Sequence, residues 1–491
     1  MRAGSPAPPL DDTASGNHLD KQADLRALGS EDSQLETKNT AVLPPGPAGL
    51  PVVGNLLQFR RDPLAFVSGV QRSFGRVATM RMARLPIVMF FRPEHVRYFL
   101  VEQARNFTSS QFNINLRRLL GDGLLTTDGE FHRQQRRLIQ PAFHKRRVEG
   151  YAGIMVQHTQ EMLDAWQPGE RLDMAQAMRD LTLRIVAKSL FDVDIQQNHP
   201  ELGASFTNVI ENPVQSPFSV RALPINLPFT PYGKHMQGKR TLDAYVYALI
   251  EERRASGRDT GDVLSMLLAA REDDVTMTDQ QVRDQTMTLF AAGHETTANA
   301  LTWTFYLLSE HPAVREKLLA ELHTVLASRA PTVDDLPQLP YLDWVISESM
   351  RLYPPAWTQG RCAIEPFELE GYHFPAKTVV MFSQWVIHRL PDIWGDPDTF
   401  RPERWDPAHA QKVPPGAYFP FGAGPRMCIG MPFAQLEARL LLATILQRYA
   451  PRLAPGYPVV PRPRVTLRPK YGIQMMLEPT IARAPAIAAS A

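Results

Sequence analysis

The chain has 491 residues, and its 53 Lys and Arg residues nearly balance its 51 Asp and Glu residues, giving a formal net charge of +2 at pH 7. This balance excludes the broad positive field by which nucleic-acid-binding proteins attract phosphates. The length is sufficient for an ample hydrophobic core. The two cysteines, Cys362 and Cys428, allow at most one disulfide bond.

Residues 1–41 are predicted to form a disordered leader, because they are rich in Asp, Ser, Gly, Pro and Gln and contain no sustained apolar run. A signal peptide needs an apolar core of roughly 7–15 residues and a membrane span needs about 20, so neither is expected. The segment 43–55 follows and is rich in proline and glycine. Its backbone constraints predict an extended, stiff stretch on the surface.

The centre of the chain is predicted to be mainly α-helical with a small β portion. Long helical periodicities occupy residues 150–190, 235–270, 279–325 and 339–352. Short apolar runs at 87–91 and 379–382 favour strands, and the runs at 465–467 and 473–477 predict a late hairpin.

The helix that begins at Thr278 carries the first candidate chemistry. Thr278 and Gln281 form a capping-box pattern, and the helix is expected to end before Pro312. In its middle, Glu295 stands next to Thr296, and an acid beside an alcohol can relay protons and order water. Taken alone, the same residues would more simply be a surface acid and a hydroxyl bonded to its own helix.

Residues 421–430 read Phe-Gly-Ala-Gly-Pro-Arg-Met-Cys-Ile-Gly and are the most informative stretch of the chain. The glycines at 422, 424 and 430 permit tight turns and close backbone approaches. Cys428 then precedes a helix, and Arg426 lies two residues away, an arrangement that favours the thiolate. Thiolates are among the ligands of haem iron. A lone cysteine here would more simply be a small buried apolar residue.

The complete loop resembles the haem-binding loop of the cytochrome P-450 family of haem-thiolate monooxygenases, and the resemblance extends from about residue 43 to residue 477. It implies the cytochrome P-450 fold, with a long central helix above a haem b and the cysteine loop beneath it. Cys428 is then the axial ligand of the haem iron, and Phe421 and Gly430 are expected to contact the haem. One catalytic domain is expected over residues 42–480, followed by a flexible tail at 481–491.

The resemblance also implies roles for residues far from the loop. It assigns Thr296 to a hydrogen bond with dioxygen and Glu295 to proton supply. The other implied groups are a structural network of Glu348, Arg351 and Arg404, haem-propionate partners His132, Arg136, Arg361 and Arg426, and substrate-pocket residues Ala292, Ala356, Trp357 and Thr358. The 348–351 spacing alone would more often mark a solvated surface pair.

The implied reaction is monooxygenation, in which one oxygen atom of dioxygen enters a large hydrophobic substrate. The stretches 292–303 and 351–357 look most like those of bacterial members that hydroxylate carotenoid rings. Fatty-acid, alkane and terpenoid hydroxylases share similar stretches and are alternatives. Peroxygenases that use peroxide, redox-neutral isomerases or dehydratases, and non-enzymatic haem sensors or storage proteins are alternatives from other classes.

The apolar segment 213–231 is expected either at the pocket entrance, where it would admit a lipophile from a membrane surface, or packed as a loop on the body. Electrons are expected from separate proteins, because 63 residues follow Cys428 and no dinucleotide-binding glycine pattern follows a strand. A small acidic ferredoxin or flavodoxin with its NAD(P)H reductase is the expected partner, in the cytoplasm. The basic residues expected to steer it are Arg133, Arg137, Lys145, Arg146 and Arg147. For Arg133 and Arg137, a solvated basic face is the simpler explanation.

Overall fold

The computed structural model describes residues 42–109, 114–194, 227, 229–272, 275–408 and 413–480, together with positions 202, 205 and 209. The chain falls into two units, Met1–Val42 and Leu43–Ala491. The predictions made for residues 1–41, for 481–491 and for most of the segment 213–231 therefore lie outside the described residues. Everything below concerns the second unit.

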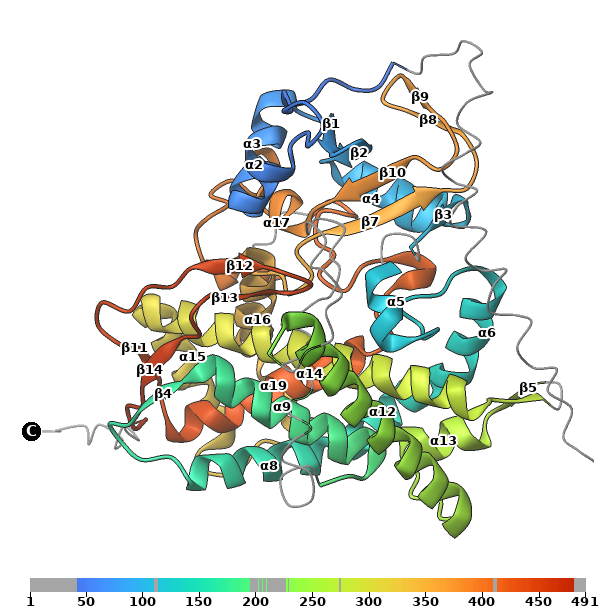
Figure 1. Ribbon diagram of the computed structural model, residues 1–491. Coiled ribbons are helices and arrows are strands. Elements are labelled where there is room, and N and C mark those ends of the chain that lie inside the picture. The colour runs from blue at the N-terminus through green and yellow to red at the C-terminus, as the bar shows by residue number, and fades with distance from the viewer. Residues whose placement is uncertain are drawn as a thin grey trace, which may run out of the picture. The chain divides into compact units, whose positions relative to one another are not determined.

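The main β-sheet joins an early part of the chain to a late part. Its order is β1-β2-β10-β7-β3, with β1 at Val77–Met82, β2 at Leu85–Phe90, β3 at Phe107–Thr108, β7 at Gln359–Ala363 and β10 at Val379–Phe382. Strand β10 runs parallel to β2 and antiparallel to β7. The strands expected at 87–91 and 379–382 are thus confirmed as neighbours in one sheet (Figure 1).

The predicted hairpin between 465–467 and 473–477 is wrong. Strand β13 (Leu467–Pro469) pairs with β12 (Pro461–Pro463), because the chain turns where the Arg464 amide donates to the Thr466 carbonyl at 3.0 Å. Strand β14 (Gln474–Met476) instead lies between β11 (Arg452–Leu453) and β4 (Arg171–Asp173). There the Asp173 carboxylate accepts the Ile473 amide at 3.0 Å. Two further pairs are β5 (Arg271–Glu272) with β6 (Val275–Thr276) and β8 (Phe367–Leu369) with β9 (Tyr372–Phe374).

Helices form most of the unit, so the expected class, mainly α with a small β portion, is confirmed. In chain order they are α2 Leu56–Arg61, α3 Pro63–Phe74, α4 Pro93–Arg97, α5 Ile114–Leu120, α6 Gly129–Ile139, α7 Lys145–Gly150, α8 Ala152–Asp164, α9 Met174–Phe191, α12 Pro231–Ser256, α13 Val263–Ala269, α14 Asp279–Glu310, α15 Pro312–Leu326, α16 Pro340–Leu352, α17 Gln384–Ile387, α18 Pro391–Trp394 and α19 Met431–Arg448. Within the described ranges, no helix is long and apolar enough to cross a membrane.

Two of the predicted long helices are interrupted. The stretch 150–190 consists of α8 and α9, because residues 171–173 between them pair as β4. The stretch 235–270 consists of α12 and α13, because Gly257 caps α12 in a left-handed conformation with φ +60°. The helical predictions over 279–325 and 339–352 are confirmed, with the expected break before Pro312.

Helix α14 runs through the middle of the unit and is buried along most of its 32 residues (Figure 1). Its predicted capping box is present: the Gln281 amide donates to the Thr278 hydroxyl, and the Thr278 amide donates to the Gln281 side chain. Ring contacts fix the helix to its neighbours, with Phe290 stacked 4.1 Å from Phe191 of α9. Since α9, α12, α16 and α19 all pack against it, α14 is the element around which the cavity walls are arranged.

The carboxylate of Glu348, on α16, is the centre of a buried polar network. Arg351 donates to both of its oxygens at 2.9 and 2.8 Å, and Arg404 donates to Oε1 at 3.1 Å. The Trp405 indole donates to Oε2 at 3.0 Å, and the Arg401 amide to Oε1 at 3.2 Å. Glu348 and Arg351 are fully buried. The structure thus brings Glu348, Arg351 and Arg404 together, and they hold α16 against the segment that precedes the cysteine loop.

Arg351→Leu is expected to destabilise the protein by about 3–5 kcal/mol, because it leaves the Glu348 carboxylate buried beside one remaining guanidinium. The control is Arg439→Gln, which breaks a more exposed ion pair with Asp343 of the same helix α16 and should cost less than about 1 kcal/mol. Urea unfolding followed by circular dichroism measures both losses. Equal losses for the two variants would contradict a special role of the buried network.

Candidate active site

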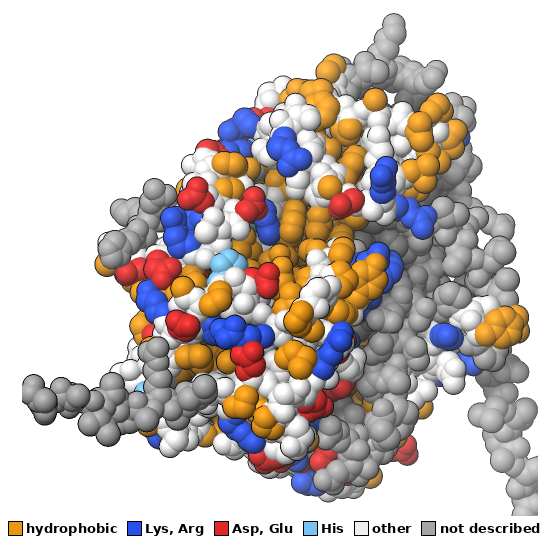
Figure 2. Space-filling view, turned by 90° about the vertical axis from the view of Figure 1, so that its left-hand side faces the viewer, with side chains coloured by type: hydrophobic (Ala, Val, Ile, Leu, Met, Phe, Trp, Pro, Cys, Tyr) orange, Lys and Arg blue, Asp and Glu red, His pale blue; other side chains and the backbone are white. Residues whose placement is uncertain are grey.

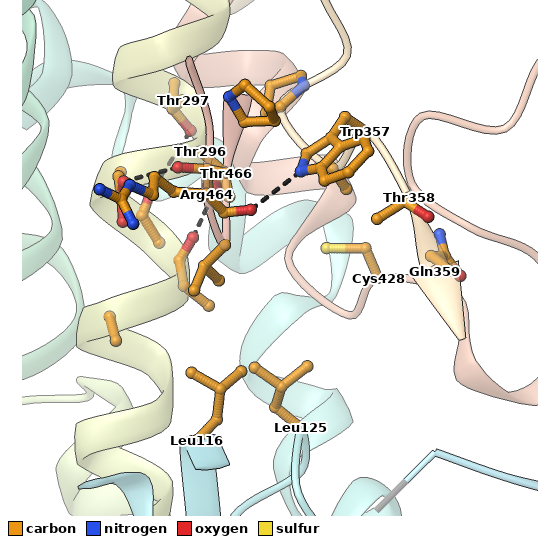
Figure 3. A pocket seen from close by; sticks show the side chains of 18 of the residues that line it. Leu116, Leu125, Thr296, Thr297, Trp357, Thr358, Gln359, Cys428, Arg464 and Thr466 are labelled. Atoms are coloured by element: carbon orange, nitrogen blue, oxygen red, sulfur yellow. Dashed lines mark hydrogen bonds between the residues drawn. The ribbon is translucent and has the colours of Figure 1, made fainter. Parts of the chain in front are cut away.

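A cavity of about 1300 Å³ lies between α14 and the cysteine loop (Figure 3). Its walls come from α2, α5, α9, α12, α14 and α19, from the turn before β7 and from the hairpin β12–β13. In the space-filling view, hydrophobic side chains line a hollow, and charged side chains of both signs surround it (Figure 2). The cavity therefore offers a mostly apolar interior that is bordered by polar groups.

The cysteine loop presents its sulfur to this cavity. Cys428 is enclosed by protein on most sides, yet its side chain is accessible from the cavity, and in Figure 3 the sulfur points into the open space. Gly424 has φ +65°, and a Cβ there would lie 1.7 Å from the Leu100 carbonyl oxygen, so only glycine fits. Gly422 also has a positive φ, of +73°. The protein's own atoms do not require glycine at position 430, since its φ is −81° and a Cβ would meet its neighbours at 3.9 Å, and its expected contact with the haem stays a prediction.

The electrostatics of the thiol differ from the sequence prediction. Burial raises the pKa of the Cys428 thiol, although backbone amides of Gly430 and Met431 and the charge of Arg136 act to lower it. Arg426 points elsewhere: it donates to the Thr127 carbonyl and pairs with Asp128. The expectation that Arg426 stabilises the thiolate is therefore wrong. A bound metal cation would act against this effect of burial, because coordination deprotonates thiols.

Buried positive charge gathers on one side of the cavity. Arg361, on β7, is only 8% exposed, and its guanidinium donates to the neighbouring Gly360 carbonyl at 2.8 Å. Burial, reinforced by the charge of Arg426, lowers the pKa of Arg361 to about 10. Burial, with Arg426 and Arg136 nearby, lowers the pKa of His132 to about 4. Arg136 is half-buried and has no hydrogen bond or ion pair to any residue of the described ranges.

Among the described residues, Asp128 is the carboxylate that offsets these charges, through its ion pair of 3.3 Å with Arg426. One carboxylate facing three guanidinium groups leaves an excess of buried positive charge, which is costly unless anions accompany it. These donors therefore fit a ligand that carries two carboxylates, and haem carries two in its propionate groups. Arg361 and Arg426 line the cavity itself, whereas His132 and Arg136 lie behind its wall on α6.

Across the cavity from Cys428, α14 contributes Ala292, Glu295 and Thr296 to the wall. The Thr296 hydroxyl donates to the Ala292 carbonyl at 2.7 Å, one turn back along the helix. Glu295 is 5% exposed, and its Oε1 accepts the hydroxyl of Thr466 at 2.6 Å. Helix α14 is continuous through this region, so the acid and the alcohol are held on a regular helix.

Thr466, at the turn of the β12–β13 hairpin, was not predicted as a site residue. Its hydroxyl donates to Glu295 and accepts from Asn299 Nδ2 at 3.2 Å, which connects the hairpin to α14. A lone polar residue within the apolar run 465–467 was the available signal. A second unpredicted group is Glu437 on α19, where burial raises the carboxyl pKa well above its ordinary value, with Thr297 as its polar neighbour.

The predicted pocket residues Ala356, Trp357 and Thr358 all line the cavity. Trp357 is 5% exposed, and its indole donates to the Arg464 carbonyl at 2.9 Å, so it also holds the hairpin in place. The Thr358 hydroxyl donates to the Phe382 carbonyl at 3.1 Å. The opposite wall was not predicted: it is formed by four leucines from α5 and the turn after it, here called the leucine wall, Leu116, Leu119, Leu120 and Leu125.

Comparisons with known proteins agree with this architecture. The sequence model of the family described as cytochrome P-450 matches residues 44–476. Cyclooctatin synthase of Streptomyces melanosporofaciens is 38% identical over 86% of this chain and 92% of that protein. Pentalenene oxygenase of Streptomyces avermitilis is 33% identical over 87% of this chain and 95% of that protein. The solved structure of a retinoic acid-bound cyanobacterial CYP120A1 superposes with a TM-score of 0.82 and 31% identity, covering 90% of this chain and all of that one. The chain belongs to the cytochrome P-450 family and is one of its monooxygenases.

Proposed function

We propose that this enzyme hydroxylates a cyclic terpenoid, using a haem b that Cys428 holds by its thiolate. One observation carries the proposal: a single apolar cavity has the Cys428 sulfur on one side and the Glu295–Thr296 pair on the other. Bound there, haem supplies the activation of dioxygen for insertion of one oxygen atom into the substrate. The remaining roles belong to this chain's own residues.

Four groups are suited to hold the cofactor's carboxylates. Arg361 and Arg426 line the cavity, and because a guanidinium group has several N–H donors, each can donate to a carboxylate besides its bonds to the protein. Arg136 supplies further positive charge from α6, and His132, whose pKa is lowered to about 4, supplies a neutral hydrogen-bonding group. Binding of two carboxylates would neutralise the excess buried charge. Cofactor binding would therefore raise the free energy of unfolding.

The side chains opposite the cysteine are arranged to deliver protons. The Thr296 Oγ1 lies at the cavity surface and can exchange its bond to the Ala292 carbonyl for one to a ligand. The hydroxyl of Thr466 keeps the Glu295 carboxyl group in place, and Glu295 can hold a proton next to Thr296. We infer that protons reach the cavity by way of Glu295 and leave the protein at Thr296 Oγ1.

The substrate class rests on the walls and on the relatives. The wall surface facing the cavity is mostly apolar and offers few partners to a polar molecule, which would leave its polar groups unpaired. The relatives are named for cyclooctatin and pentalenene, and the solved neighbour holds retinoic acid. These names favour the terpenoid alternative over the carotenoid preference of the sequence analysis, which no relative among them supports.

Electron delivery is proposed to occur at the basic surface of α6 and α7. Lys145, Arg146 and Arg147 are exposed there, while Arg133 and Arg137 share the carboxylate of Glu130. A locally positive surface on a near-neutral protein steers an acidic partner such as a ferredoxin or a flavodoxin. The reductase that uses NAD(P)H would act on that partner.

Cys428→Ala is expected to abolish the red-shifted Soret band of the reduced carbon monoxide complex, because that band requires a thiolate ligand. The control is Cys362→Ala, a change at a buried β7 residue outside the cavity, which should leave the band intact. Difference spectroscopy of the purified proteins measures both. A band that survives in Cys428→Ala and is lost in Cys362→Ala would overturn the ligand assignment.

Thr296→Ala is expected to lower the product formed per NAD(P)H consumed by at least about tenfold, because a positioned proton donor is lost from the cavity. Thr302→Ala is the matched control: this hydroxyl makes the same bond one turn back, to the Ala298 carbonyl at 2.7 Å, but is buried away from the cavity. Coupling in a ferredoxin system is measured with labelled dioxygen. Unchanged coupling in Thr296→Ala would remove its proton role, and turnover without reductant or without label would favour an isomerase or peroxygenase.

Cyclic terpenoids are expected to shift the ferric haem towards high spin at low micromolar concentrations, whereas β-ring carotenoids and long-chain fatty acids are expected to bind at least about tenfold more weakly. The expected difference comes from shape, because an apolar pocket distinguishes lipophiles by how closely they contact its walls. Side-by-side absorbance titrations measure the affinities. A response to carotenoids or to fatty acids alone would replace the terpenoid assignment, and tight binding of small polar molecules would overturn the apolar substrate class.

A further inference from the structure

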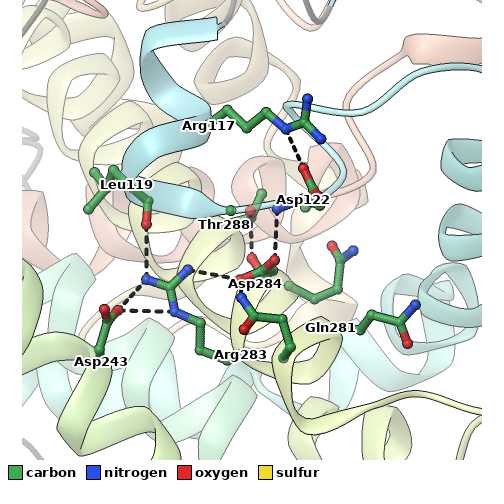
Figure 4. Close-up of polar contacts among 12 residues, drawn as sticks. Arg117, Leu119, Asp122, Asp243, Gln281, Arg283, Asp284 and Thr288 are labelled. Atoms are coloured by element: carbon green, nitrogen blue, oxygen red, sulfur yellow. Dashed lines mark hydrogen bonds and ion pairs between the residues drawn. The ribbon is translucent and has the colours of Figure 1, made fainter. Parts of the chain in front are cut away.

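Arg283 is a buried junction that connects three helices (Figure 4), one of which, α5, lines the cavity through Leu119. Its guanidinium contacts Asp243 of α12 through two nitrogens, one of them at 3.0 Å from Oδ1. It donates to Asp284 of α14 at 2.8 Å and to the carbonyl of Leu119 of α5 at 3.0 Å. A single side chain that is 3% exposed thus ties α5 and α12 to α14.

Asp284 extends this junction into the turn that follows α5. Its Oδ2 accepts the Asp122 amide at 2.8 Å, and next to it Gln285 Oε1 accepts the Leu124 amide at 3.1 Å. The turn lies directly on α14: a Cβ at Gly121, where φ is +71°, would be 2.2 Å from the Asp284 carboxylate. The turn can approach this closely because position 121 is glycine.

These bonds fix the backbone that carries the leucine wall. The bonded groups are the Leu119 carbonyl and the amides of Asp122 and Leu124. Leu120 and Leu125 are next to bonded residues in the chain, and Leu116 lies one turn before Leu119 on α5. Helix α5 has seven residues. Helices this short are marginal by themselves, so the position of α5 depends on its tertiary contacts. The cavity surface along the leucine wall is therefore set by the charged junction behind it.

The charges in the junction are strongly coupled. Burial alone would lower the pKa of Arg283, but hydrogen bonds to Asp243 and Asp284 outweigh it and the pKa is raised. Buried ion pairs of this kind add little net stability compared with apolar packing, yet removing one member is costly. The ion pairs of Arg283 are therefore better suited to defining one arrangement of the three helices than to raising the stability of the fold.

We propose that Arg283 and Asp284 are positioning residues that determine which lipophiles the enzyme accepts, by fixing the leucine wall on α14. The proposal rests on the proposed haem-containing cavity and adds to it the element that sets its shape. Loosening the junction should let α5 and the turn after it move away from α14. Bulky ligands then gain affinity, and compact ligands lose contacts with the wall.

The test compares Asp284→Asn with a matched control, Asp279→Asn. Asp284→Asn removes one charge of the junction. Asp279→Asn breaks an exposed ion pair between the same two helices, Arg254 of α12 and Asp279 of α14, which does not involve α5. The carbon monoxide spectrum verifies that each protein contains thiolate-ligated haem. Arg283→Lys is a milder second variant, since it keeps the charge but loses the planar fork that contacts three partners at once.

Two measurements are made on each haem-loaded protein. Hydrogen exchange over residues 114–126 is expected to accelerate in Asp284→Asn and Arg283→Lys and to stay unchanged in Asp279→Asn. Spectral titration with a compact azole, phenylimidazole, and a bulky one, clotrimazole, is expected to show a shift in their affinity ratio of roughly tenfold towards the bulky azole in the junction variants, the discrimination that about one methylene provides in an apolar pocket.

Faster exchange with an unchanged azole ratio would overturn the proposal, because the wall would then be held by the junction without selecting ligands. Unchanged exchange would overturn it as well, because the wall would not depend on the junction. A wild-type protein that binds neither haem nor azoles would instead refute the proposed function, which distinguishes the two failures.

Discussion

Four residues from two parts of the chain, Arg351 of α16 and three residues of the segment 401–405, donate hydrogen bonds to the Glu348 carboxylate, which has no contact with solvent. Arg351 of the same cluster also donates to the carbonyls of His388, Pro397 and Thr399, so the segment 388–405 is fixed to α16 by its backbone. The cysteine loop follows this segment, and the Tyr418 hydroxyl donates to the Ser347 carbonyl on the way. The position of Cys428 therefore depends on a buried charge cluster, and removing one member of this cluster costs several kcal/mol of stability.

The cavity also contains groups that are unfavourably buried, and these are the arginines on one of its sides. Burial raises the pKa of the Cys428 thiol, while Arg361 and Arg426 bring buried positive charge that few carboxylates offset. A planar ligand with a metal cation at its centre and two carboxylates at its edge would favour the thiolate form of Cys428 and neutralise the excess positive charge. Binding of the cofactor would therefore also stabilise the folded state.

Sequence reasoning succeeded where contacts are local or where a contiguous motif carries the information. The Thr278–Gln281 capping box and the break before Pro312 depend on residues within one turn of the helix end. The leucine wall and Thr466 were missed because their partners are remote: Arg283 reaches Leu119 across 164 positions, and Thr466 reaches Glu295 across 171. The late hairpin failed for a related reason, since Asp173, far earlier in the chain, attracts the amide of Ile473. Strand propensity alone does not identify a partner.

The most direct test of the central claim is an X-ray structure of the purified, haem-containing enzyme with diffraction measured at the iron absorption edge. The account predicts one iron peak in the cavity, bonded to the Cys428 sulfur and facing Thr296, with the two propionates on Arg361 and Arg426. An iron bonded to another side chain, or propionates that leave Arg361 without an anionic partner, would contradict it.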